Sequence, residues 1–285
     1  MSNILGYKDI QTGNTGPSRS IWNDWDALKA IRDPGYGVEF WDDFCGHTLP
    51  AVAPVLTTQV QVGGGYKGFA SATAVVGPSV AQGAFGVLTL YLNGTAAEDE
   101  AASIATAAQP FIIGGTTPTK KLWFECRIKL PNVNTLGTNF FIGLGECSLC
   151  TLAAIVPIVA AGTPVAATSG LVGFFKPEAN LTTFDFIYAD RTTAVTPAAG
   201  TFSYAASTWT KIGFTYDSSN TASIFTLYQD GVVVAQDTAV TLAVWAALSN
   251  IDTNPLGLIA AVHEGTGHAN TDAVYMDWWR CAQLR

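Results

Sequence analysis

The chain has 285 residues, of which 48% are hydrophobic and 13% charged, and its formal net charge is −8. This composition excludes intrinsic disorder, because so apolar a chain buries a substantial core. The 14 basic residues form no cluster, so we expect no nucleic-acid partner. The length fits one large all-β domain with extensions as well as it fits two domains.

The N-terminal region reads as a polar arm followed by one helix. Residues 1–17 are rich in Gly, Ser, Thr and Asn, and they lack the basic start and apolar stretch of a signal peptide. A helix is predicted over residues 20–32, where apolar side chains recur at helical spacing: Ile21, Trp25, Leu28 and Ile31. The turn residues Asp33-Pro34-Gly35 end it.

From residue 38 onward the pattern changes to short strands separated by turns. The clearest strand runs from Trp123 to Leu130, and its alternation predicts that one face meets water: Trp123, Glu125, Arg127 and Lys129. Asp230-Gly231 predicts a hairpin turn. Similar strands are predicted over residues 85–92, 140–144, 171–175, 184–188, 211–216, 224–229, 232–236, 256–262 and 273–280.

This strand pattern predicts antiparallel sheets packed as a sandwich. We expect residues 1–37 to form the arm and short helix, and residues 38–285 to form one domain with an apolar loop insertion near 147–170. Pro157 and Gly162 interrupt that insertion, so no membrane span is expected.

The C-terminal half resembles a known family. Residues 209–217 (WTKIGFTYD) and 225–232 (FTLYQDGV) resemble the hairpin of laminin-G-like and concanavalin A-like jelly-roll domains. The run 274–280 (VYMDWWR) is similar to the strand that closes such sandwiches beside the first strand, here residues 38–44. The resemblance implies an all-β jelly-roll sandwich of antiparallel sheets over residues 38–285.

A second resemblance concerns the order of segments. The polar arm, the residues Trp41-Asp42-Asp43-Phe44, the segment 93–101 and the strand 121–130 together resemble virion structural proteins of tailed bacteriophages. This resemblance implies assembly in the host cytoplasm into a virion. It also implies a capsid decoration subunit that contacts the major capsid protein or other virion subunits and forms a homo-oligomer.

Chemistry-bearing motifs are weak. Concanavalin A-like folds include glycoside hydrolases, which need two facing carboxylates, but the E-x-D-x-x-E motif of the glucanase branch is absent. Glu98 and Glu100 lie in a segment that reads as a solvated turn, while Asp42 and Asp43 point to opposite faces of any strand. No general acid and base can be assembled, so we expect a protein that is not an enzyme and holds no cofactor.

Metal sites are likewise not predicted. His263 and His268 are five residues apart instead of four, and two glycines between them favour a surface loop over a zinc helix. The five cysteines include the pair Cys147 and Cys150, but no second such pair follows, so structural thiols are favoured.

The remaining candidates are surfaces for contact with a partner. The anchor-type residues of the helix and the apolar loop are the predicted contacts: Trp22, Trp25, Leu28, Ile155, Val156, Pro157 and Ile158. Packing of the loop on its own sandwich is an equal alternative. The predicted function is capsid decoration; the alternatives are a carbohydrate-binding, lectin-like module on the virion surface or tail that contacts glycans, and a degenerate glycoside hydrolase.

Overall fold

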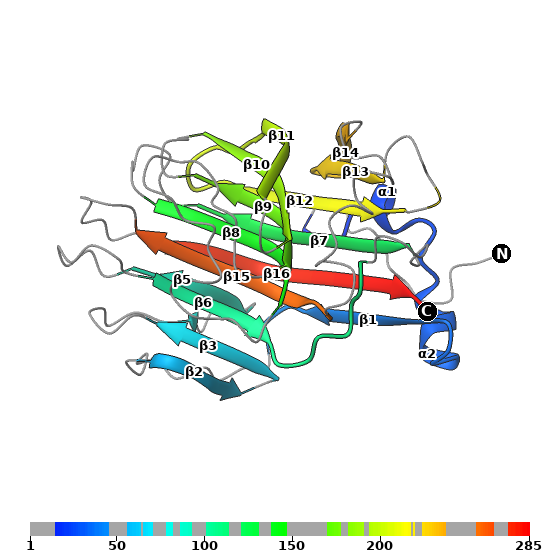
Figure 1. Ribbon diagram of the computed structural model, residues 1–285, viewed down its shortest axis with the longest axis horizontal. Coiled ribbons are helices and arrows are strands. Elements are labelled where there is room, and N and C mark those ends of the chain that lie inside the picture. The colour runs from blue at the N-terminus through cyan, green and yellow to red at the C-terminus, as the bar shows by residue number, and fades with distance from the viewer. Residues whose placement is uncertain are drawn as a thin grey trace.

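The computed structural model shows two antiparallel β-sheets packed face to face (Figure 1). It describes residues 15–45, 56–63, 65–70, 78–81, 86–92, 101–113, 121–130, 138–146, 170–177, 182–190, 194–217, 219, 224–237, 255–264 and 273–285. The two layers confirm the predicted all-β jelly-roll sandwich.

The first sheet, called sheet A, has the strand order β14-β13-β12-β7-β16-β5-β4, and β1 also pairs with β16. Its strands are β1 (Gly37–Asp42), β4 (Pro78–Ala81), β5 (Val87–Tyr91), β7 (Leu122–Lys129), β12 (Trp209–Tyr216), β13 (Phe225–Gln229), β14 (Val232–Asp237) and β16 (Ala273–Leu284).

The second sheet, called sheet B, has the order β11-β10-β9-β8-β15-β6-β3-β2. Its strands are β2 (Leu56–Gly63), β3 (Tyr66–Ala70), β6 (Ala101–Thr106), β8 (Thr138–Gly145), β9 (Gly170–Lys176), β10 (Thr183–Asp190), β11 (Ala194–Ser203) and β15 (Gly257–Glu264).

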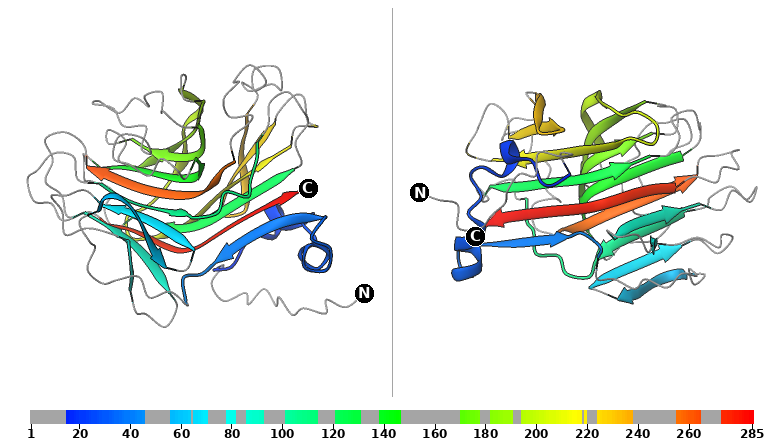
Figure 2. Two further views of the ribbon diagram at one scale, coloured as in Figure 1. Left: turned by 60° about the horizontal axis from the view of Figure 1, so that its bottom comes forward. Right: turned by 180° about the vertical axis from the view of Figure 1, so that it is seen from behind.

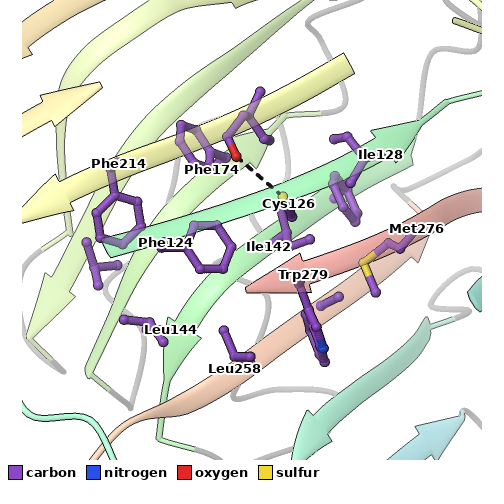
Figure 3. Close-up of a cluster of buried hydrophobic side chains, with 14 of the residues drawn as sticks. Phe124, Cys126, Ile128, Ile142, Leu144, Phe174, Phe214, Leu258, Met276 and Trp279 are labelled. Carbon is purple, nitrogen blue, oxygen red and sulfur yellow. Dashed lines mark hydrogen bonds between the residues drawn. The ribbon is translucent and has the colours of Figure 1, made fainter. Parts of the chain in front are cut away.

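Apolar side chains from alternate positions of both sheets fill the space between the layers (Figure 3). Phe124 of β7 stacks on Phe214 of β12 with ring centroids 5.2 Å apart, and Phe174 of β9 approaches them from sheet B. Cys126 and Cys281 are free, buried thiols, and burial raises the pKa of both well above its usual range. These two cysteines therefore act as core residues.

Every strand predicted from the alternating patterns is present, within a few residues at each end. Asp230 and Gly231 have φ values of 49° and 79°, as the predicted hairpin turn between β13 and β14 requires. The closing strand β16 pairs with β1 in antiparallel register, from Gly37 opposite Leu284 to Asp42 opposite Trp279, which confirms the predicted neighbour.

The prediction of a single helix over residues 20–32 is wrong. The segment forms two short helices, α1 (Arg19–Trp22) and α2 (Ala27–Arg32), and α2 ends where predicted. Asp26 starts α2 by accepting a hydrogen bond from the Lys29 N–H at 2.9 Å. Both helices lie on the side of sheet A that faces away from sheet B, as Figure 2 shows. Neither is long enough to cross a membrane.

Candidate functional site

The outer face of sheet A carries its side chains in rows that cross the strands. Strand β7 directs alternate side chains to this face: Trp123, Glu125, Arg127 and Lys129. Opposite residues of paired strands share a face, so Lys129 has Trp209 of β12 on one side and Tyr275 of β16 on the other. We call these three residues the open row: Trp209, Lys129 and Tyr275.

The open row places an ammonium group between two aromatic rings. The Nζ of Lys129 lies 4.9 Å from the ring centroid of Trp209 and 4.7 Å from that of Tyr275. All three side chains are partly exposed to solvent. Since Trp209 and Tyr275 flank β7, their backbones are separated by two strand spacings, or about 10 Å.

Polar side chains border the open row on the next row of the sheet. Arg127 forms an ion pair with Asp277, and both side chains are less than a fifth exposed. The guanidinium carbon of Arg127 also lies 4.8 Å from the ring centroid of Trp209. The open row therefore combines aromatic rings with a cation and an adjacent ion pair, a set of groups able to hold a polar ligand that has apolar faces.

The other end of the same face is covered by residues 15–32, which we call the N-terminal segment. The Trp278 indole N–H donates to the Thr15 carbonyl at 2.7 Å, and the Lys211 ammonium donates to the Gly16 carbonyl at 3.2 Å. These contacts begin one row away from the open row, because Trp278 and Lys211 both lie opposite Arg127.

Glu125 of β7 is the main anchor of this segment. Its Oε2 atom accepts hydrogen bonds from the Ser18 backbone N–H at 2.8 Å and from the Trp22 indole N–H at 2.7 Å. The carboxyl group is buried, and burial raises its pKa; the bonds from Ser18 and Trp22 and the nearby Lys211 oppose that rise. The covered carboxyl is thus a structural group rather than a ligand for solvent-borne molecules.

Arg280 of β16 forms the second anchor. Its Nε donates to Oε1 of Glu39 at 2.7 Å, and the guanidinium carbon lies 4.0 Å from the Trp22 ring centroid. The indole N–H of Trp25 donates to the other oxygen of Glu39 at 2.8 Å. Trp25 also packs against Trp123, with ring centroids 5.3 Å apart.

The prediction that the outer residues of β7 all face water is therefore wrong for two of them. Trp123 is 1% exposed and Glu125 is fully buried, because the N-terminal segment lies over both. Arg127 and Lys129 keep partial exposure. Sequence reasoning missed the open row as a site, although the alternation in β7 was a signal that could have located it.

The predicted partner contacts fall into three groups. Trp22 and Trp25 are 8% and 7% exposed and pack within the chain, whereas Leu28 on α2 is 40% exposed. The four loop residues lie outside the described part of the chain: Ile155, Val156, Pro157 and Ile158. A partner contact at any of these residues stays a prediction.

The outer face of sheet B differs from that of sheet A. The large apolar side chains that the structure describes on this face are at most 3% exposed, among them Phe141, Phe175, Ile187 and Ile259. Polar side chains on the same face, Asn139 and His263, are buried opposite one another. The exposed aromatic side chains of the described residues, Trp41 and Tyr91, instead belong to strands of sheet A.

Of the weak histidine, glutamate and cysteine motifs, the structure describes His263 but not the other candidate residues. His263 lies in β15 and is 5% exposed, so the predicted surface loop is wrong at this residue, while His268 lies outside the described residues. So do Glu98, Glu100 and the cysteine pair Cys147 and Cys150. Within the described ranges, no group of three or more metal-ligating side chains comes together.

No family model matches the sequence, and no curated protein matches it. Solved structures do match. A protein of unknown function from Shewanella oneidensis is 12% identical, with a TM-score of 0.52, over 91% of this chain and 94% of that one. An endo-1,3-beta-glucanase from Streptomyces sioyaensis is 15% identical, with a TM-score of 0.52, over 88% of this chain and 97% of the enzyme.

The likeness to the glucanase overturns the expectation that this chain is not an enzyme. That expectation depended on the failure to assemble a general acid and base from the sequence, yet an enzyme shares the fold over nearly its whole length. At these identities the likeness establishes fold and not activity. The chain adopts the concanavalin A-like jelly-roll fold, in agreement with the resemblance of residues 209–232.

Proposed function

We propose that this protein binds carbohydrate at the open row on the outer face of sheet A. The observation that carries the proposal is the pair of partly exposed rings, Trp209 and Tyr275, held in register on either side of Lys129. Aromatic rings offer an apolar surface to the C–H groups of a sugar, while neighbouring polar groups bond to its hydroxyls.

The ring positions suit an extended ligand. Trp209 and Tyr275 stand on strands separated by β7, so a sugar chain lying across the strands meets both rings and Lys129 in turn. The ion pair between Arg127 and Asp277 borders this path and supplies both donors and acceptors. Strands hold these groups more rigidly than loops do, which lowers the entropy lost on binding.

Glycan-array screening of the purified chain, followed by calorimetric titration, tests the proposal. The glucanase that shares the fold makes a β-1,3-glucan hexasaccharide the first ligand to titrate. Trp209→Ala is expected to weaken binding about tenfold through loss of ring contact. Trp41→Ala is the matched control, because Trp41 is 43% exposed on the same sheet but outside the open row. Failure to bind any glycan, or equal affinities for wild type and Trp209→Ala, contradicts the proposal.

A second candidate function is attachment to a virion, as the segment order implies. It is supported by α2, which buries none of its residues and exposes Leu28 by 40% and Ile31 by 76%. Exposed aliphatic groups of this kind are common contacts between proteins. The double variant Leu28→Ser/Ile31→Ser is expected to lose cosedimentation with purified phage heads; retained cosedimentation, or none by the wild type, contradicts attachment through α2.

A further inference from the structure

Among the described residues, Lys129 has aromatic neighbours but no anionic partner. Across the described part of the chain no carboxylate lies within ion-pair distance of its ammonium group, whereas the neighbouring Arg127 is paired with Asp277. Lys129 therefore contributes the uncompensated positive charge at the centre of the open row. This charge contrasts with the net charge of −8 on the whole chain.

The two rings hold this charge in place. Contacts of 4.9 Å and 4.7 Å to the ring centroids attract the ammonium group and restrict its long side chain. A cation whose rotamers are already restricted loses less entropy when it binds an anion than a free surface lysine does. Partial removal from water also strengthens its attraction to an anionic group.

From these observations we infer that the ligand of the open row is an acidic glycan, one whose sugar rings carry carboxylate or sulfate groups. The inference rests on the proposed function and names its substrate class. The acidic group lies against the Lys129 ammonium, and the sugar rings on either side lie against Trp209 and Tyr275. One ionic contact between two aromatic contacts matches a polymer that alternates apolar ring faces with acidic substituents.

The balance of charge favours a glycan over a nucleic acid. Arg127 is compensated by Asp277, and the Lys211 ammonium donates to the Gly16 carbonyl beside the buried Glu125. A nucleic acid presents a phosphate at every nucleotide and is held by several lysines and arginines. In the open row and the row beside it, the described residues leave one lysine uncompensated, which is too few for that backbone but sufficient for one acidic group of a sugar.

A matched set of ligands tests the inference: a β-1,3-glucan hexasaccharide, the same hexasaccharide oxidised at C6 to carboxylates, and its sulfated form. Calorimetric titration of the wild type is expected to show about tenfold tighter binding of at least one acidic form, as one charge-assisted contact provides. Lys129→Gln should bring the ratio of acidic to neutral affinity close to one, while Lys129→Arg keeps the preference. Trp41→Ala should leave the ratio unchanged.

The outcomes separate this inference from the proposed function. If the neutral hexasaccharide binds as tightly as both acidic forms, the acidic class is wrong while carbohydrate binding stands. If an acidic preference persists in Lys129→Gln, the inference is wrong because the preference arises elsewhere. If no glycan binds at all, the proposed function fails with it. Tighter binding of single-stranded DNA than of any glycan also overturns the inference.

Discussion

The two ends of strand β7 have the same alternating pattern and opposite environments. At one end Glu125 is buried and accepts two hydrogen bonds from the N-terminal segment. At the other end Lys129 is partly exposed, and its ammonium group lies against two aromatic rings. One face of β7 thus has a structural part and a part that we propose binds a ligand. The N-terminal segment, which is distant in sequence, determines the boundary between them because it covers Glu125 and leaves Lys129 open.

The difference shows that a polar sheet face is a site only where the chain leaves it open. Trp22 and Trp25 donate their indole N–H groups to Glu125 and Glu39, so both carboxyl groups already accept hydrogen bonds from donors within the chain. In the described part of the chain, the Lys129 ammonium of the open row has no such partner. We call Trp123, Glu125 and the N-terminal segment over them the covered end. The following variants compare the covered end with the open row.

The largest expected effect is on stability at the covered end. Trp22→Ala removes the ring that lies on Arg280 and the donor to Glu125, so we expect a loss of about 3 kcal/mol in the free energy of unfolding. Urea denaturation measures it. Trp209→Ala is the matched variant in the open row, with an expected loss of about 1 kcal/mol because its ring is partly exposed. Equal losses would contradict the contrast between the two ends.

A second variant, Glu125→Gln, removes the contribution of Glu125 to the pH dependence of the free energy of unfolding. Burial raises the pKa of Glu125 above its ordinary value of 4.5, so the folded state holds this proton more tightly than the unfolded state. The stabilisation of the folded state by protonated Glu125 is complete at pH values below the pKa of this group in the unfolded state. It is lost as the pH rises through the pKa of the same group in the folded state. Glu125→Gln keeps an oxygen acceptor for Ser18 and Trp22 but does not titrate.

The free energy of unfolding of the wild type, relative to Glu125→Gln, is therefore expected to fall as the pH increases from 4.5 upward. Chemical denaturation over a series of pH values measures this difference. Trp209→Ala serves as the control and should follow the wild-type pH dependence. A wild type that gains stability over Glu125→Gln with rising pH would show that hydrogen bonds outweigh burial at this carboxyl.

The smallest expected effect on stability is in the open row. Lys129→Gln removes a cation that has ring contacts but no ion-pair partner among the described residues, so the free energy of unfolding should fall by about 0.5 kcal/mol. Thermal and urea denaturation check this. A loss similar to that of Trp22→Ala would assign Lys129 a structural role instead of a binding role.

Local patterns in the sequence were sufficient for most of sheet A. Alternation at residues 123–130 and the Asp230-Gly231 turn are local signals, and both are confirmed in β7 and in the β13–β14 hairpin. Strand β6 (Ala101–Thr106) was missed because both of its faces are buried, so small and apolar residues follow one another without alternation.

The helix prediction failed for a different reason. The spacing of Ile21, Trp25 and Leu28 fits one helix, but the indole N–H of Trp25 bonds to Glu39 of β1, and Asp26 begins a new helix. A contact between distant parts of the chain thus outweighed local helical spacing. The same long-range docking buries Glu125, which no local pattern could indicate.

The sequence by itself determined the hairpin, the strands with clear alternation and, through the resemblance of residues 209–232, the jelly-roll class. Alternation and turn geometry act within a few residues, and they did not indicate β2, β3, β4, β6 and β11. Only the tertiary structure decided which part of the outer face of sheet A is open, since that depends on where residues 15–32 pack. It also brought Trp209, Lys129 and Tyr275 together from three strands far apart in sequence. Strand register, a long-range property, turns these separate residues into one row.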